Sequence, residues 1–184
     1  MTPTTIRTER LILRPWRDED FDAFAAMSAD PEVMEFLLPL PDRAASDEVA
    51  RLLKAHIETH GFGFWAVEAP GIAPFIGFTG LLNVRPDAPY APAVEVGWRL
   101  ARSHWGNGYA TEAARAALAY GFKELGLDEI VALTVPANIR SQQVMQRLGM
   151  TRNETDDFDH PRVPDGHVLK RHVLYRLRRP PIRP

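Results

Sequence analysis

The segment that decides the fold joins Val94–Leu100 (VEVGWRL) to Trp105–Thr111 (WGNGYAT), and an alanine-rich stretch follows it. The β-branched and apolar residues of the first part predict a strand, and the alanine-rich stretch predicts a helix. The two glycines between them permit a tight turn whose N–H groups can approach a phosphate. The start of the helix adds unpaired donors and a partial positive charge. The segment therefore predicts an anion-binding loop between a strand and a helix.

Short glycine motifs also occur in nucleotide-binding folds, and two of these are disfavoured here. The Rossmann pattern requires a third glycine where this chain has Thr111, and an acidic residue after the next strand, which instead ends at Val135-Pro136. The P-loop pattern requires a Gly-Lys-Ser/Thr sequence, which does not follow. A turn that only starts a helix stays open as the plain alternative.

A second segment, Asn138–Met150, follows the next predicted strand. Asn138 is a plausible helix N-cap, and Ser141 lies one turn later on the same helical face. Gly149 ends the helix. Taken alone, this segment predicts an ordinary capped helix.

The rest of the chain alternates predicted strands and helices without an internal repeat or a long linker, which favours one α/β domain on a mixed sheet. Predicted strands cover residues 5–14, 63–68, 75–83, 94–100, 130–135, about 150–158 and 170–177. Predicted helices cover 18–29, with Asp18 as the cap, 44–60, 108–125 and 141–148, with a short helical turn from Pro31.

Together the two segments resemble the GNAT acetyltransferase superfamily, and more closely its Rim-type branch, which includes ribosomal-protein N-terminal acetyltransferases. The superfamily loop, Arg/Gln-x-x-Gly-x-Gly/Ala, matches Trp105–Ala110 except that Trp105 replaces the Arg or Gln. The branch often has Trp-Gly-x-Gly-Tyr-Ala-Thr-Glu-Ala, which Trp105–Ala113 reproduces. Its Asn-x-x-Ser segment ending in Leu-Gly-Met/Phe matches Asn138–Met150. Residues 8–14 and 30–34 are also similar, so the resemblance spans about 5–177.

This resemblance implies a single N-acetyltransferase domain over residues 1–184, with a core of about 5–177 and a basic tail at 178–184. The implied α/β fold has a mixed central sheet of about seven strands, splayed open after the fourth strand and flanked by about four helices. Acetyl-CoA is the implied acyl donor. Its pantetheine arm would enter the opening and its pyrophosphate would bind the glycine loop. The implied cofactor-binding residues are Trp98, Arg99, Leu100, Trp105, Gly106, Asn107, Gly108, Tyr109, Ala110, Thr111, Asn138 and Ser141.

Two residues are candidates for the catalytic chemistry, which is expected to be direct attack by an amine because the chain has no cysteine nucleophile. Glu95 lies in an apolar strand that would raise its pKa, so it is the candidate base, and a solvated surface carboxylate is the alternative. Many superfamily members place a tyrosine acid where this chain has Met145. Ser141 is then the candidate donor to the leaving sulfur, against the alternative of a plain surface serine.

Composition narrows the remaining classes of function and location. The absence of cysteine, of an apolar run long enough for a bilayer and of a signal-peptide pattern favours a cytoplasmic protein that does not span a membrane. His56 and His60 have the i, i+4 spacing of zinc proteases, but Ile57 replaces the Glu that such a site requires. The other histidines show no ligand pattern, so no metal is expected. Residues 170–184 hold six of the 22 Lys and Arg residues and no acidic residue. Their partial alternation with apolar residues predicts an edge strand with charge on its solvent face rather than a nucleic-acid site.

The sequence thus predicts an acetyl-CoA-dependent N-acetyltransferase that acts on a primary amine, either a protein N-terminus or a small molecule. A catalytically silent CoA-binding regulatory module is the alternative, and a homodimer stays open. Residues 154–165 add an acidic cluster that either attracts a cationic amine or forms a solvated loop. Its carboxylates are those of Glu154, Asp156, Asp157, Asp159 and Asp165.

Overall fold

One mixed sheet runs through the molecule in the order β1-β2-β3-β4-β5-β6-β9-β7, and β8 pairs with β9 as well. The computed structural model describes residues 3–180. The strands are β1 (Ile6–Arg7), β2 (Ile12–Arg14), β3 (Phe64–Ala69), β4 (Ala73–Asn83), β5 (Val94–Leu100), β6 (Glu129–Thr134), β7 (Thr151–Arg152), β8 (Phe158–Asp159) and β9 (Arg171–Arg178). The helices are α1 (Asp20–Ala29), α2 (Pro31–Met34), α3 (Arg43–His60), α4 (Tyr109–Lys123) and α5 (Ile139–Arg147).

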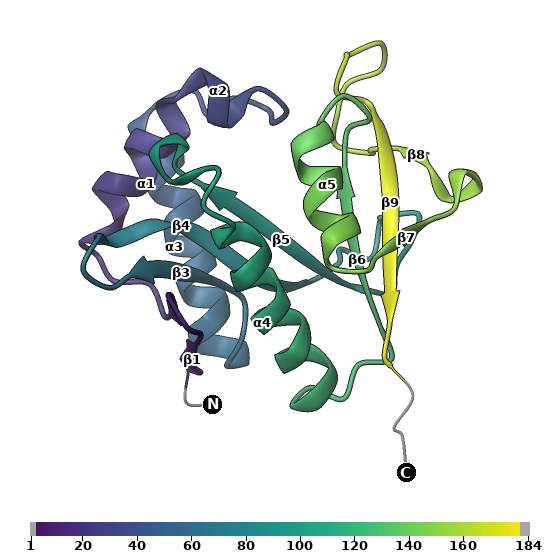
Figure 1. Ribbon diagram of the computed structural model, residues 1–184. Helices are drawn as coiled ribbons and strands as arrows, with labels where there is room; N and C mark the ends of the chain where they lie inside the picture. Colours follow the sequence, from purple (N-terminus) through teal and green to yellow (C-terminus); the bar gives the residue numbers. More distant parts are fainter. Residues whose placement is uncertain (1–2, 181–184) are drawn as a thin grey trace.

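The sheet consists of two halves that meet between β5 and β6. Strand β5 pairs along its full length with β4, from Val94 opposite Asn83 to Leu100 opposite Gly77. Its parallel pairing with β6 is limited to one position, Glu95 opposite Val131. Beyond that position the two strands diverge (Figure 1). The predicted opening of the sheet after residues 94–100 is confirmed.

Helices α1 and α4 lie on opposite faces of the N-terminal half. A Cβ at Gly121 of α4 would come within 2.9 Å of Leu81 of β4, so α4 packs closely on that face. The neighbouring Phe78 points to the other face, because side chains alternate along a strand. There it contacts Phe24 of α1, with ring centroids 6.1 Å apart. The sheet therefore separates an α4 side from an α1 side.

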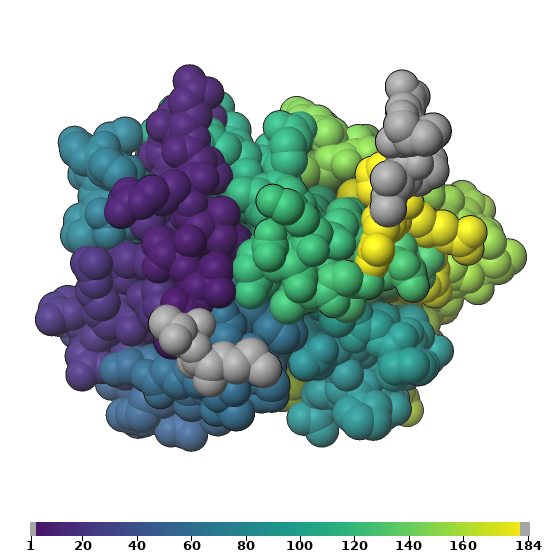
Figure 2. All heavy atoms as spheres, turned by 90° about the horizontal axis from the view of Figure 1, so that it is seen from below, coloured from purple at the N-terminus to yellow at the C-terminus, as the bar shows by residue number. Residues whose placement is uncertain are grey.

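The first hairpin is tied to the start of α4 through Glu112. Its carboxylate accepts hydrogen bonds from the Thr8 hydroxyl at 2.6 Å and from the Arg10 backbone N–H at 2.9 Å, and it also binds the Arg10 guanidinium. Although burial opposes the shift, these bonds hold the pKa of Glu112 below its usual range. Seen from below, the N-terminal strands lie beside α4 (Figure 2). This contact fixes the glycine loop, residues 105–111, against the hairpin.

Three predicted elements differ from the structure. Residues 5–14 form a hairpin of β1 and β2 instead of one strand, with the Leu11 N–H bonded to the Thr8 hydroxyl in the turn. Helix α1 begins at Asp20, and Asp18 forms an ion pair with Lys54 instead of capping it. The strand expected near 150–158 is divided into β7 and β8 by a 3₁₀ turn. The described residues therefore contain nine strands and five helices.

The prediction that residues 170–177 form an edge strand is wrong. Strand β9 pairs with β6 on one side and with β7 and β8 on the other. Its basic side chains meet acidic partners, and Arg176 binds Glu129 at 2.7 Å and Asp156 at 2.8 Å. Within the described range, Arg179 is near Asp128, at 3.4 Å. The last four residues of the predicted basic tail, 181–184, lie outside the described residues.

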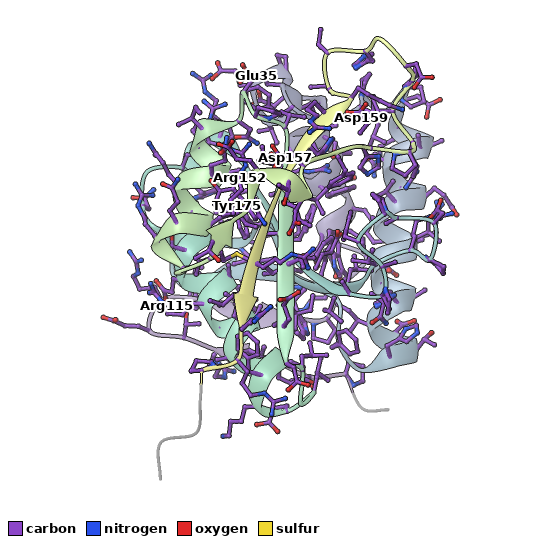
Figure 3. All side chains as sticks on the ribbon, turned by 90° about the vertical axis from the view of Figure 1, so that its right-hand side faces the viewer. Glu35, Arg115, Arg152, Asp157, Asp159 and Tyr175 are labelled. Atoms are coloured by element: carbon purple, nitrogen blue, oxygen red, sulfur yellow. The ribbon has the colours of Figure 1, made fainter. Side chains whose placement is uncertain are left out.

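Four of the five carboxylates of the acidic cluster, those of Asp156, Asp157, Asp159 and Asp165, form ion pairs with basic residues. Asp157 binds Arg152, which holds the pKa of Asp157 below its usual range, and the two lie side by side near Tyr175 in Figure 3. Asp159 pairs with Arg171, and Asp165 with Lys170. The carboxylates of the cluster are absent from the lining of the main cleft described below. These contacts favour the solvated-loop alternative over attraction of a cationic substrate.

A buried arginine joins the first strands to α1. Arg14 donates two hydrogen bonds of 2.8 Å to Asp20, one of 2.8 Å to Glu68 and one of 2.6 Å to the Pro74 carbonyl. Only 5% of the Arg14 side chain and 3% of the Asp20 side chain are exposed. Two charges removed from water are tolerated because almost every polar atom has a partner.

Replacing Asp20 with Asn should lower the free energy of unfolding by about 3 kcal/mol, because it leaves a buried guanidinium short of negative charge. Urea unfolding would measure the change. The matched control is Asp22→Asn, since the Asp22 side chain is 87% exposed in its pair with Arg43, and this variant should lose no more than about 0.5 kcal/mol. Equal losses in the two variants would contradict the importance of the buried pair.

Candidate active site

A cleft of about 1150 Å³ lies where the two halves diverge. It is lined by β5, the glycine loop, the first turns of α4, the start of α5 and the segment around α2. Most of the residues predicted to bind the cofactor line it. They are Trp98, Arg99, Leu100, Trp105, Gly106, Gly108, Tyr109, Ala110, Thr111, Asn138 and Ser141. Asn107 and Glu95 lie outside this lining.

The glycine loop has the conformation that its two glycines allow. Gly106 and Gly108 have φ angles of 79° and 78°, a region that other residues rarely adopt. Gly108 is also the N-cap of α4, so it brings no side chain to the first-turn N–H groups. Ala110 and Thr111 continue this surface into the cleft. The predicted turn with a helix start at its end is confirmed, and its donors suit a phosphate.

Asn107 stabilises this loop from behind instead of entering the cleft. Its side-chain amide donates to the carbonyls of His104 at 3.3 Å and Trp105 at 3.1 Å. Its own carbonyl accepts a hydrogen bond of 3.0 Å from Arg10. The side-chain amide of Asn107 is thus used within the loop, and the prediction that Asn107 contacts the cofactor stays a prediction.

Several cationic residues around the cleft were missed by the sequence analysis. Arg115 lines the cleft four residues after Thr111, on the same face of α4. Its Nη2 approaches the Arg147 carbonyl at 3.4 Å, and Arg147 also lines the cleft. Helical spacing from Thr111 could have indicated Arg115, whereas the position of Arg147 depends on how α4 and α5 pack. Both guanidiniums could meet phosphate groups of a ligand.

Arg140 connects the two sides of the cleft. It extends from α5 over the ring of Trp105, 4.6 Å from the ring centroid, and binds Glu35 at 2.8 Å. Glu35 lies just beyond α2, at the top of the view in Figure 3. The tryptophan that departs from the superfamily motif thus supports a cation at the mouth of the cleft.

Asn138 and Ser141 lie at the start of α5, as predicted. The Asn138 side-chain oxygen accepts a hydrogen bond of 3.1 Å from the Ser141 N–H, and its amide group donates to the Thr134 hydroxyl at 3.0 Å. Asn138 is therefore the N-cap that fixes this end of α5. Ser141 faces the cleft, and its hydroxyl has no hydrogen-bond partner within residues 3–180. Met145, one turn later, is buried in the same wall.

Glu95 lies at the closed end of the opening, at the only residue of β5 that pairs with β6. It is partly buried, and burial raises its pKa to about 7. Burial also raises the pKa of Tyr90, and the nearby charge of Glu95 adds to that shift. A carboxyl group with this pKa can accept a proton near neutral pH, which is what a general base requires.

The GNAT acetyltransferase domain model matches residues 10–151, most of the chain. The chain belongs to the GNAT acetyltransferase family. A relative from Aspergillus fumigatus, the FsC-acetyl coenzyme A-N(2)-transacetylase, is 32% identical over 96% of this chain and 80% of its own length. This GNAT protein is thus an N-acetyltransferase.

Solved structures agree with this assignment. An acetyltransferase from Agrobacterium tumefaciens superposes with a TM-score of 0.76 at 29% identity, covering 97% of this chain and 96% of its own. RimJ from Mycobacterium smegmatis, solved with CoA-disulfide, has a TM-score of 0.77 at 23% identity and covers 97% of this chain and 90% of its own. The Rim-type branch is therefore among the structural neighbours of this GNAT protein.

Two further findings concern the described residues. No helix within residues 3–180 is long and apolar enough to cross a membrane. The same residues contain no group of three or more His, Cys, Asp and Glu side chains that could hold a metal ion.

The raised pKa of Glu95 predicts a pH-dependent cost in stability. An unfolded glutamate has an ordinary pKa of about 4.5, so between pH 4.5 and 7 the folded state binds more protons than the unfolded state. Stability should therefore fall as the pH rises through this window. Glu95→Gln should remove this loss. Between pH 5 and pH 8.5, its free energy of unfolding relative to wild type should therefore rise by up to about 3 kcal/mol.

Chemical unfolding at the two pH values would measure this difference. Glu58→Gln is the matched control, since Glu58 is an exposed carboxylate of α3. If both variants follow wild type across the pH range, burial does not raise the pKa of Glu95.

Proposed function

We propose that this protein transfers the acetyl group of acetyl-CoA directly to a primary amine. The observation that carries the proposal is one continuous cleft that joins the glycine loop to Ser141 and to the residues around α2. An extended ligand with phosphates at one end and a reactive group at the other fits such a surface. The FsC relative, whose name includes acetyl coenzyme A and an N(2) position, supports an amine as acceptor.

The residues present suit acetyl-CoA, which supplies the acetyl group as a reactive thioester. The free N–H groups between Gly106 and Thr111 would hold the pyrophosphate, with Arg115 and Arg147 beside them. The edge of β5 that faces the opening, from Trp98 to Leu100, offers backbone groups to the pantetheine amides. Ala110 leaves this surface free of a bulky side chain.

The amine must lose a proton to attack a carbonyl carbon, and Glu95 is the proposed acceptor of that proton. The C–N bond forms as the C–S bond breaks, and the departing sulfur gains negative charge. We assign the Ser141 hydroxyl to donate a hydrogen bond to this sulfur, because it faces the cleft and makes no other hydrogen bond within the described residues. One N-acetyltransferase domain is proposed to extend past residue 151, since β9 completes the same sheet.

Acetyl-CoA should raise the melting temperature of the protein, because a ligand bound only by the folded state stabilises it. At 100 times the dissociation constant, the gain is about 2.7 kcal/mol, or about 5–10 °C for a chain of this size. Ala110→Glu should abolish the shift by placing an anion at the phosphate position. Ala119→Glu, which adds the same charge to an exposed position of α4, is the control.

Release of free thiol on addition of amines would then test the transfer itself. A melting shift with thiol release supports the proposal, and a shift without release with any amine would favour the silent CoA-binding module. Equal shifts with acetyl-CoA in wild type and Ala110→Glu would show that the glycine loop is not the phosphate site.

Ser141→Ala should lower kcat by about 10²-fold if its hydroxyl contacts the sulfur mainly as charge develops. The KM for acetyl-CoA should change little, because the contact forms late. Ser103→Ala, at an exposed position before the glycine loop, is the control. Steady-state kinetics would decide, and a variant that keeps more than about half of the wild-type kcat, with chemistry rate-limiting, would leave Ser141 as a surface serine.

A further inference from the structure

Arg99 is a partly exposed cleft residue, and one nitrogen of its guanidinium is buried without a partner. Its Nη1 is inaccessible and makes no hydrogen bond within residues 3–180. Burial lowers the pKa of Arg99 to about 10, and no neighbouring charge contributes to that shift. A buried cation without a partner is costly, so its presence in a cleft calls for an explanation.

Arg14, a buried arginine with a structural role, provides a comparison for Arg99. Its buried guanidinium binds two carboxylates and two backbone carbonyls, so its donors are occupied. Arg99 instead lies over the rings of Phe78 and Phe24, at 5.2 Å and 6.0 Å from their centroids. These aromatic contacts support the cation without occupying its Nη1 donors.

The acids nearest the cleft do not neutralise Arg99. Glu32, which lines the same cleft, binds Arg102 at 2.9 Å. Glu35 binds Arg140. Glu95 does not contribute to the pKa shift of Arg99, so the two charges are not in contact. Burial alone accounts for the shift of the Arg99 pKa, so no carboxylate of the described residues neutralises Arg99, and a ligand in the cleft could supply that partner.

The position of Arg99 in the sheet indicates which ligand. Arg99 is opposite Phe78 in the β4–β5 ladder, so its side chain lies on the α1 side of the sheet. Helix α4 and the glycine loop lie on the other side. Glu95, four residues earlier on the same strand, shares that face, about 13 Å away along the backbone. The arginine is thus on the side from which an amine would reach the proposed base.

We propose that Arg99 binds a carboxylate of the acceptor, and that the preferred acceptors are small amines that carry a carboxylate group, such as α-, β- or γ-amino acids. The planar guanidinium can hold a carboxylate through two parallel hydrogen bonds, which fixes the orientation of a small molecule. The amine at the other end is then directed toward Glu95. This inference rests on the proposed acetyl transfer and names its substrate class.

The kinetic test compares matched pairs, each an amino acid and its carboxamide, with α, β and γ spacing between nitrogen and carboxyl carbon. Rates are divided by the fraction of neutral amine, because this fraction differs between an acid and its amide. For the spacing that fits, wild type should prefer the acid by about 10- to 100-fold in kcat/KM. Arg99→Met, which keeps an apolar stem over the rings, should reduce this preference to about one.

Three measurements separate a binding role from a structural one. Arg99→Lys keeps the charge without the fork and should retain only part of the preference. Arg102→Met makes the same chemical change at an exposed position outside the cleft lining and should leave the preference as in wild type. The KM for acetyl-CoA should be unchanged in Arg99→Met, and a rise similar to the loss of selectivity would place Arg99 on the cofactor and overturn the proposal.

A binding measurement without turnover separates this inference from the proposed function. Calorimetric titration of the CoA-bound protein with N-acetyl-amino acids and their amides should show tighter binding of the acids, lost in Arg99→Met. This result without any thiol release would refute the acetyl transfer but retain the carboxylate site. Acetyl transfer with no preference for acids in kinetics or binding would refute the carboxylate site alone.

Discussion

Within residues 3–180 the two halves of the sheet are joined by a single backbone pairing, Glu95 with Val131, and the cleft lies where this pairing ends. Buried backbone N–H and C=O groups require partners, so two strands that diverge inside a protein leave groups to be satisfied by other means. The Leu100 carbonyl accepts a hydrogen bond of 2.8 Å from the Trp105 indole. The backbone groups between Glu95 and Leu100 that do not bond β4 lie on the edge of β5 that faces the opening. The opening of the sheet and the extended binding surface are therefore consequences of the same constraint.

The parts of this architecture that could be predicted from the sequence are those decided locally. The strand 94–100, the turn at Gly106 and Gly108 and the start of α4 follow each other within 20 residues, and each has its own signal. The Asn138 cap is likewise local, since its partner is the Ser141 N–H three residues later. In such segments the residue pattern and the final structure agree, because few tertiary contacts compete with them.

The parts that were not predicted depend on contacts between distant residues. The alternation in β9 resembles that of an edge strand, and only the pairing of Arg176 with Asp156 and Glu129 shows that its charges lie between strands. The hairpin at residues 6–14 forms because Glu112, about 100 residues away, binds the turn at Thr8 and Arg10. In the site, Asn107 has the right position in the motif, but its amide is used within the loop. A motif thus predicts the backbone better than the role of each side chain.

On the α1-side face of β5, burial disfavours the charged forms of two titratable residues, Glu95 and Arg99. Burial raises the pKa of Glu95 to about 7 and lowers that of Arg99 to about 10, so on one strand an acid and a base are both destabilised in their charged forms. The buried Arg14 and Asp20 pair, with its bonds of 2.8 Å, shows the contrasting arrangement, in which each charge has a partner. A protein under selection for stability alone would replace both residues with apolar ones. A ligand that brings an ammonium group to Glu95 and a carboxylate to Arg99 would give each charged form a partner. Its binding would be favoured because it offsets two costs that burial imposes on the protein.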